Sequence, residues 1–355
     1  MAFPKPPSDR TAVDAAGQFV IQRLKHPLKL HYWRARHNAL TLVNAWRVAH
    51  AFPLNTFQTT LRRKAVGVDQ QALVSQRIKR LRAIRDKLTR MPWLQLSEMQ
   101  DIGGCRAVVR SVSQVRKLVA EYKVSRIRHQ LIDEDDYINK PKKTGYRSYH
   151  LIYSYSSDDV PTWNRLKIEM QFRSHAQHAW ATAVETVGTF TDQALKANRG
   201  SDEWKRFFAL MGTEIALREG TPPVPGTPSS KDDLLKELRE LVQQLNVIYR
   251  LRAYGSMLKA TFANPQLRRA RFFLLSVDPV ASGITIRAYR ASELERAFED
   301  LNKTERENVK KPRQDAVLVS VDSLTALRNA YPSYFMDTHR FVREVERALR
   351  TADHP

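Results

Sequence analysis

The segment from Asp136 to His150 holds the most chemically suggestive residues of the chain. It gathers three lysines, one arginine and a glycine–tyrosine pair in a stretch too polar to fill a core. Pro141 and Gly145 disfavour a regular helix there and favour a turn of fixed shape. Lysine ammonium groups bind phosphates, and the flat ring of Tyr146 offers a base a stacking surface. The segment therefore predicts a nucleotide-binding turn. The alternative is an exposed hairpin loop that carries only solubilising charge.

Two carboxylates flank this turn in the sequence and are candidates for a metal site. Asp101 stands before a predicted strand at residues 106–110, and Glu169 stands in the middle of another at 166–172. An acid in a half-buried strand is costly unless a cation or a metal accompanies it. Two such acids beside a lysine-rich turn suit Mg²⁺ that carries nucleotide phosphates. The alternative is that each acid forms an ordinary salt bridge with an arginine.

A basic segment precedes these strands, and its periodicity predicts a helix over residues 73–88. Arg77, Lys79 and Lys87 lie on the surface of this helix at spacings that share a broad face at best. Spacing alone does not make them ligands, because basic helix faces are usually solvated or face nucleic acid. The apolar side of the predicted helix consists of Leu73, Ile78, Leu81, Ile84 and Leu88.

The elements that must hold these groups in place form a first domain at residues 1–220. Helical spacing of apolar residues predicts helices over 12–50, with a break at Pro27, and over 115–122 and 175–197. A third strand at 150–155 alternates in character, so one of its faces is free for chemistry. The pattern predicts an α/β (α+β) fold with a mixed sheet flanked by helices.

A proline-rich segment at 221–231 predicts a linker, because four prolines cannot continue a helix or a central strand. Beyond it, residues 232–355 predict a small C-terminal α+β domain. Its predicted elements are a helix over 234–248, strands at 272–277, 284–289 and 316–321, and helices from Ser292 and over 338–349.

Composition sets limits on the function. The 355 residues carry a net charge of +22, and residues 1–90 hold 18 lysines and arginines against four acids, a net +14. This excess predicts a polyanionic partner, nucleic acid rather than a membrane surface. Cys105 is the single cysteine, which excludes an internal disulfide and a multi-cysteine zinc site. No run is long and apolar enough for a membrane span or a signal core, so a cytoplasmic protein is predicted.

Four motifs occur in order over about 100 residues: Arg77-x-Lys79 with Lys87, Asp101-Ile-Gly-Gly-Cys-Arg106, Asp136-Tyr-Ile through Gly-Tyr146-Arg-Ser-Tyr-His150, and Glu169-Met-Gln-Phe-Arg173. Together they resemble the synthetase domain of the RelA/SpoT superfamily, the alarmone synthetases, in a small, synthetase-only form. The resemblance implies a nucleotidyltransferase-like fold that transfers pyrophosphate from ATP to a 3′-hydroxyl and releases AMP. Ala83 and Ser174 depart from the serine and threonine that are usual there, without removing a metal ligand.

The resemblance implies a role for each matched residue. Asp101 and Glu169 would be catalytic and hold Mg²⁺, and Glu169 would also help to deprotonate the acceptor hydroxyl. The ATP-binding residues would be Arg77 and Arg106, which enclose the adenine, and Lys79 and Lys87, which hold the phosphates. The acceptor-binding residues would be Lys142, Tyr146, Arg147 and His150, with Tyr146 stacked on the base.

The C-terminal residues resemble those of fused toxic synthetases of the CapRel type, on Ala316-Val-Leu-Val-Ser320 and Leu327-Arg-x-Ala-Tyr331-Pro-Ser-Tyr334. This resemblance implies a toxin–antitoxin fusion for phage defence that modifies the CCA end of tRNA. Its C-terminal domain, a zinc finger without metal ligands, would be the antitoxin. Tyr331 and Tyr334 would block the nucleotide pocket until a phage protein, such as a capsid protein, binds.

Three alternatives remain open at this stage. Both tyrosines could simply pack the core of the small domain. The enzyme could be a small alarmone synthetase that makes (p)ppGpp or (p)ppApp from ATP and a purine nucleotide. The chain could also be a non-enzymatic RNA-binding regulator, although it keeps Asp101, Glu169 and Tyr146 together.

Overall fold

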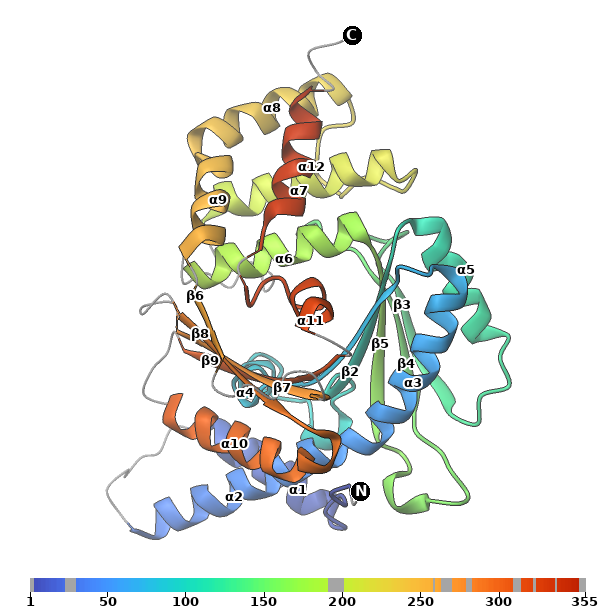
Figure 1. Cartoon of the computed structure of the whole chain (residues 1–355), viewed down its shortest axis with the longest axis vertical. Coiled ribbons are helices and arrows are strands. Elements are labelled where there is room, and N and C mark those ends of the chain that lie inside the picture. Colours follow the sequence, from blue (N-terminus) through green and yellow to red (C-terminus); the bar gives the residue numbers. More distant parts are fainter. Residues whose placement is uncertain are drawn as a thin grey trace.

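A single mixed sheet runs through the computed structural model, which describes residues 3–22, 30–190, 201–257, 259–262, 270–278, 283–308, 314–321, 324–335 and 337–350 (Figure 1). Within these residues β2 pairs with β5, and β6 with β8, in parallel, and all other neighbouring strands are antiparallel. In order across the sheet, the nine strands are β3 (Gln130–Asp136), β4 (Tyr149–Ser154), β5 (Lys167–Ser174), β2 (Gly103–Val109), β1 (Leu73–Ile78), β9 (Asp315–Ser320), β7 (Phe272–Asp278), β8 (Gly283–Tyr289) and β6 (Lys259–Phe262).

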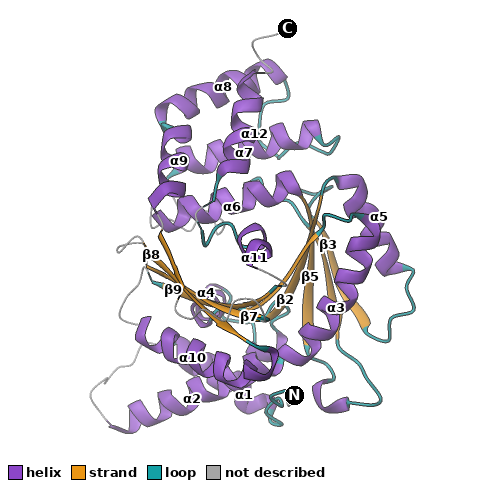
Figure 2. Ribbon diagram, in the orientation of Figure 1, coloured by secondary structure: helices purple, strands orange, loops and turns teal. Residues whose placement is uncertain are grey.

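Helices cover the sheet and form a further layer beside it (Figure 2). Those that pack around the sheet are α1 (Arg10–Ile21), α2 (Leu30–Ala49), α3 (Ala51–Val68), α4 (Leu81–Arg90), α5 (Val112–Lys123), α10 (Leu294–Glu307) and α11 (Leu324–Ala330). The further layer is a helix bundle, which consists of α6 (His175–Phe190), α7 (Asp202–Arg218), α8 (Lys231–Gln244), α9 (Val247–Met257) and α12 (His339–Arg350). Short 3₁₀ helices lie at Leu96–Glu98, Pro161–Trp163 and Ala291–Glu293. Helix α11 lies between the sheet and α6 (Figure 1).

Buried apolar side chains explain this arrangement. The largest cluster fills the space between the sheet and α1–α5 and α10, and a second holds the helix bundle together. In α12, Phe341, Val342 and Val345 recur at helical spacing and are buried in the bundle, while the arginines of the helix point outward. A third cluster joins β7–β9 to α11 and includes Tyr331 and Tyr334.

The predicted fold class is confirmed, and one predicted element is wrong. Residues 73–88 are not one helix, because Leu73–Ile78 forms strand β1 and the helix α4 begins only at Leu81. β1 gains hydrogen-bonded partners on both sides, from β2 and β9, and this tertiary pairing outweighs the local helical pattern. The break expected at Pro27 lies outside the described residues.

The predicted linker is a loop held against α7. Thr213 Oγ1 accepts a hydrogen bond from the Val224 amide at 2.9 Å, and Val224 is buried. The C-terminal strands nevertheless extend the same sheet as the N-terminal strands, so the domain boundary at 221–231 stays a prediction.

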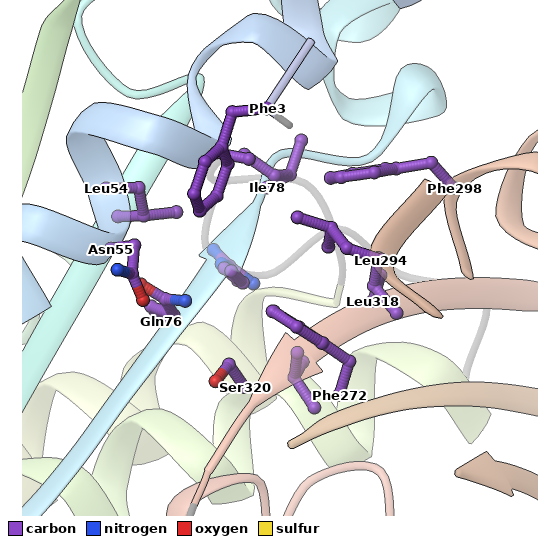
Figure 3. Close-up of a pocket in the computed structure, with 13 residues that line it drawn as sticks. Phe3, Leu54, Asn55, Gln76, Ile78, Phe272, Leu294, Phe298, Leu318 and Ser320 are labelled. Atoms are coloured by element: carbon purple, nitrogen blue, oxygen red, sulfur yellow. The ribbon is translucent and has the colours of Figure 1, made fainter. Parts of the chain in front are cut away.

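The two halves of the sheet meet at a short seam. β1 and β9 share only two register pairs, Gln76 with Ser320 and Arg77 with Val319. Beside the seam lies a mainly apolar cavity of about 20 Å³, where Leu54, Ile78 and Leu318 face one another and Phe3 approaches from the N-terminal arm (Figure 3). A cavity of this size has room for about one water molecule. Because β1 and β9 share so few register pairs, the seam has fewer backbone hydrogen bonds than the strand pairs on either side of it.

Gly145 fixes the predicted turn against α7. Its φ of +90° is in the region that favours glycine, and a Cβ there would lie 2.7 Å from the Phe208 carbonyl oxygen. We expect Gly145→Ala to lower the free energy of unfolding by about 1–3 kcal/mol, measured by thermal or urea unfolding. Gly67→Ala is the control, because a Cβ at Gly67 meets nothing within 4 Å and alanine favours the helix. Equal stability of the Gly145 variant and the wild type would contradict this account.

Candidate functional site

Two lysines and one carboxylate form the first part of the site. Lys79 follows β1, Lys87 lies on α4, and Asp101 precedes β2. Lys79 Nζ donates to Asp101 Oδ2 at 2.6 Å, and Lys87 Nζ donates to Asp101 Oδ1 at 2.9 Å. Burial alone would raise the pKa of Asp101, but the two ammonium groups outweigh it and hold this pKa well below its ordinary value. Asp101 is therefore ionised, and the two lysines converge on one point as phosphate ligands must.

A second carboxylate lies on the neighbouring strand. Glu169 of β5 is opposite Gly104 of β2 in the parallel register. A Cβ at Gly104 would come within 3.9 Å of Glu169 Oε2, so the glycine leaves space beside this oxygen. Glu169 Oε1 contacts His150 Nδ1 at 2.9 Å. Burial would raise the pKa of Glu169, but His150 lowers it, so this carboxylate is also ionised.

His150 links Glu169 to Tyr146. Its Nε2 lies 2.9 Å from the Tyr146 hydroxyl, while its Nδ1 faces Glu169. Burial alone would lower the pKa of His150, but Tyr146 and Glu169 outweigh it and raise this pKa to about 9. At neutral pH the imidazole is therefore protonated, and both of its nitrogens donate.

Tyr146 is held on its other side by cations. Arg173 Nη2 donates to the Tyr146 hydroxyl at 2.7 Å, and the Arg173 guanidinium lies 5.2 Å from the ring centroid. Lys142 Nζ lies 5.7 Å from the same ring and 4.2 Å from the ring of Tyr137. The predicted acceptor residues Lys142, Tyr146 and His150 are thus brought together.

The structure does not bring Arg147 into this group. Its guanidinium is buried and donates to the Ile138 carbonyl at 3.0 Å and to Thr221 Oγ1 at 3.3 Å, and it also bonds the Pro222 carbonyl. Arg147 follows Tyr146 directly, but its hydrogen bonds go to residues outside the acceptor group. In this position Arg147 joins the turn to the proline-rich loop.

Arg77 of β1 and Arg106 of β2 line a small pocket that the C-terminal residues largely fill. The Arg106 guanidinium lies 5.5 Å from the ring centroid of Tyr331, and Arg106 Nη2 donates to the Ala330 carbonyl. The Tyr331 hydroxyl donates to the Gln76 carbonyl at 2.7 Å. About 10 Å³ of space is left in this pocket, which also includes Tyr334. The turn at 331–334 therefore occupies the place predicted for adenine, while both tyrosines also pack in a core cluster.

Sequence reasoning gave no role to four residues that the structure places in the site. Gln171 and Arg173 lie two and four residues after Glu169, so strand alternation could have placed them on the same face. Gln171 Nε2 donates to Glu169 Oε2 at 2.7 Å. Tyr137 and Glu185 gave no such signal. Glu185 of α6 accepts a hydrogen bond from Ser333 at 2.6 Å, a contact that depends on the fold.

The two carboxylates are candidates for one Mg²⁺ site. Asp101 stands just before β2, and Glu169 lies on the adjacent strand β5, opposite Gly104. Among the described residues no cluster of three or more histidine, cysteine, aspartate or glutamate side chains exists. Two carboxylates, with the remaining positions left to phosphate and water, are the donor set that Mg²⁺ takes with nucleotides.

The His150–Glu169 pair predicts a loss of stability in alkaline solution. Because the pKa of His150 in the folded protein, about 9, exceeds the ordinary value of 6.5, its stabilising contribution is complete below pH 6.5 and is lost as the pH rises through 9. We expect the melting temperature to fall more steeply between pH 7 and 10 for the wild type than for His150→Gln, in scanning calorimetry. His129→Gln is the control, because burial lowers the pKa of His129. Parallel curves for the wild type and His150→Gln would contradict this prediction.

Comparisons with known proteins match the part of the chain that carries this site. Residues 76–190 match the model described as a region found in RelA / SpoT proteins. GTP pyrophosphokinase YjbM of Bacillus subtilis is 34% identical over 116 residues, which are 32% of this chain and 54% of that protein. The chain thus spans about half the length of this curated relative. The matched region supports the RelA/SpoT resemblance, and Tyr331 and Tyr334 lie outside it.

Two solved structures are similar to the chain. Small alarmone synthetase 1 from Bacillus subtilis, bound to its product pppGpp, has 23% identity and a TM-score of 0.42, covering 52% of this chain and 92% of that chain. A GTP pyrophosphokinase family protein from Streptococcus pneumoniae has 22% identity and a TM-score of 0.40, covering 62% of this chain and 98% of that chain.

Among the described helices, none is long and apolar enough to cross a membrane.

Proposed function

We propose that the chain is an ATP-dependent pyrophosphokinase of the small alarmone synthetase kind, which transfers pyrophosphate from ATP to the 3′-hydroxyl of a purine nucleotide to make (p)ppGpp or (p)ppApp. One observation carries the proposal. Lys79, Lys87 and Asp101 converge beside the Glu169–His150–Tyr146 chain of contacts, inside the region that matches RelA / SpoT proteins. A phosphate-binding group thus lies next to a base and a stacking ring.

The residues divide the work between the two substrates. Lys79 and Lys87 hold the ATP phosphates, Arg77 and Arg106 enclose the adenine, and Tyr146 stacks on the acceptor base. Mg²⁺ held by Asp101 and Glu169 neutralises phosphate charge when it is bound.

The transfer itself needs a base at the acceptor hydroxyl. The 3′-oxygen forms a bond to the β-phosphorus of ATP, the bond from this phosphorus to the α,β-bridging oxygen breaks, and AMP leaves with that electron pair. Glu169 takes up the hydroxyl proton, and His150 orients its carboxylate. Catalysis by positioning and charge neutralisation suits a site of cations and carboxylates without a nucleophile.

The CCA end of tRNA is a second candidate acceptor. The net charge of +14 over residues 1–90 favours it, because a free nucleotide does not need so large a basic region. Exposed side chains of this region include Arg34, Arg63, Arg82 and Arg90. Binding of tRNA by these residues would be strongly salt-dependent, whereas transfer to a free nucleotide would be less so.

The turn at 331–334 supports a regulatory proposal. Tyr331 lies against Arg106 in the pocket proposed for adenine, which supports the proposal that this conformation is autoinhibited. We propose that a protein trigger, such as a phage capsid protein, binds the C-terminal residues and withdraws the turn, as in a toxin–antitoxin fusion for phage defence. Because ATP and both candidate acceptors are cytoplasmic molecules, we propose that this activity takes place in the cytoplasm.

Labelled ATP tests these proposals directly. The purified protein and its Tyr331→Ala variant are incubated with γ-³²P-ATP and, separately, with GTP, unlabelled ATP or tRNA. Label on a guanosine or adenosine nucleotide supports the alarmone reaction, and label on tRNA alone supports the second candidate. Failure of Tyr331→Ala to transfer label to any acceptor in the presence of Mg²⁺ would overturn the enzymatic proposal.

A further inference from the structure

A glutamate of the C-terminal half contacts the junction between β1 and α4. Glu305 of α10 accepts two hydrogen bonds from Arg47 of α2, with Arg47 Nη1 2.8 Å from Oε2 and Arg47 Nη2 3.1 Å from Oε1. Glu305 Oε1 also accepts a hydrogen bond from the Leu81 amide at 3.0 Å. The Arg47 side chain is 1% exposed and that of Glu305 is 9% exposed, so this is a buried and fully engaged contact.

Arg47 also contacts the main chain of Lys79. Arg47 Nε donates to the Lys79 carbonyl at 3.0 Å, and the Lys79 amide donates to the Ile102 carbonyl at 2.8 Å. Ile102 directly follows Asp101, the residue that Lys79 Nζ contacts. The backbone of Lys79 is therefore held on both sides, which limits where its ammonium group can reach.

Glu305 also takes the place of a helix cap. Arg80 is the N-cap residue of α4 and makes no side-chain cap hydrogen bond of its own, so the Leu81 amide depends on Glu305. A carboxylate at this end also interacts favourably with the helix dipole. Because α4 carries Lys87, the cap fixes the start of the helix that delivers the second ammonium group to Asp101.

We infer that Glu305 is a positioning residue for the donor site, one that sets the spacing of Lys79 and Lys87 through Arg47 and the Leu81 amide. This role rests on the proposed pyrophosphokinase function. The C-terminal half then acts on the donor site in two opposite ways: its 331–334 turn fills the adenine position, and α10 completes the phosphate-binding pair. Productive activation must withdraw the turn while α10 keeps its contact with α4.

The role is tested in full-length protein that carries Tyr331→Ala, so that the pocket is open. Glu305→Gln is expected to raise the KM for ATP about three- to tenfold and to leave the KM for the acceptor within about twofold. Asp315→Asn is the matched control, since Asp315 pairs with Arg80 at the same junction but contacts neither Arg47 nor Leu81. It is expected to leave the KM for ATP unchanged.

A second variant guards against misfolding, because Glu305→Gln leaves the buried guanidinium of Arg47 without its carboxylate partner. In Arg47→Met with Glu305→Leu, the ion pair, the Lys79 contact and the cap are all removed without an uncompensated charge. This protein is expected to melt close to its parent yet show the raised KM for ATP. A variant that melts like its parent and keeps the parental KM would overturn the positioning role.

A readout that needs no activity separates this role from the proposed function. Competitive acetylation with mass spectrometry measures the reactivity of the Lys79 and Lys87 amines, and both are expected to react several-fold faster in the Glu305 variants and unchanged in Asp315→Asn. If both lysines react as slowly in the Glu305 variants as in Asp315→Asn, the positioning role is overturned even if the enzyme is active. Faster labelling in a protein that transfers no pyrophosphate would support the positioning and reject the proposed function instead.

Discussion

Replacing Glu169 by glutamine is expected to lower the rate of pyrophosphoryl transfer about 10²- to 10⁴-fold, the range for loss of a general base. Glutamine keeps the shape of the side chain and can still contact His150, but it cannot take up the proton of the 3′-hydroxyl. It also removes one of the two carboxylates that fit Mg²⁺. Initial rates with γ-³²P-ATP, measured in the Tyr331→Ala background, give the ratio.

Glu134→Gln is the control for this substitution. Glu134 lies on β3, which β4 separates from the β5 strand of Glu169, and it is 44% exposed and pairs with Lys123 at 2.6 Å. Its rate should equal that of the parent protein. A Glu169→Gln rate within about tenfold of the parent would show that another group removes the proton, and it would return Glu169 to a structural role.

Truncating Tyr331 to alanine is expected to raise the pyrophosphokinase rate at least about tenfold. The tyrosine ring covers the face of Arg106, and its hydroxyl bonds the Gln76 carbonyl, so the turn is held closed by both contacts. Loss of a buried aromatic side chain costs about 3–5 kcal/mol, several times the 1.4 kcal/mol that corresponds to a tenfold shift toward the open turn. Initial rates and growth of cells that express the variant both report the opening.

Two controls separate release of the turn from general loosening. Tyr331→Phe keeps the ring over Arg106 and loses only the hydroxyl contacts with Gln76 and Ser75, so its rate should rise far less. Tyr289→Ala removes another buried tyrosine of the C-terminal half, on β8 and bonded to Asp300 rather than to the site. If Tyr289→Ala activates the enzyme as strongly as Tyr331→Ala, the turn has no specific inhibitory role.

The parts of the fold that the sequence predicted well are those decided by local chemistry. Pro141 and Gly145 predicted a turn, and alternation predicted β4 and β5, because these signals act over a few residues. The helix predicted over 73–88 was wrong because β1 is decided by pairing with β2, 25 to 35 residues later, and with β9, more than 230 residues later. No window of local periodicity contains these partners.

The site shows the same division. Motif order pointed to Asp101 and Glu169, and the structure places Asp101 just before β2 and Glu169 on the adjacent strand β5. The contacts of Glu185 and Glu305 come from helices that pack against the site only in the folded chain, so their sequence positions gave no warning. Arg147 shows the reverse case, since this basic residue of a binding motif is buried and bonds the Ile138 carbonyl instead of joining the acceptor group.

The two-pair seam between β1 and β9 also bears on what happens when the chain is cut or only partly synthesised. In the intact protein β9 covers the edge of β1, and β1 covers the edge of β9. A fragment that ends before β9 would present Leu73–Ile78 as an unprotected strand, with its amide and carbonyl groups open to a second chain. The C-terminal strands thus protect the N-terminal half of the sheet against edge-to-edge aggregation.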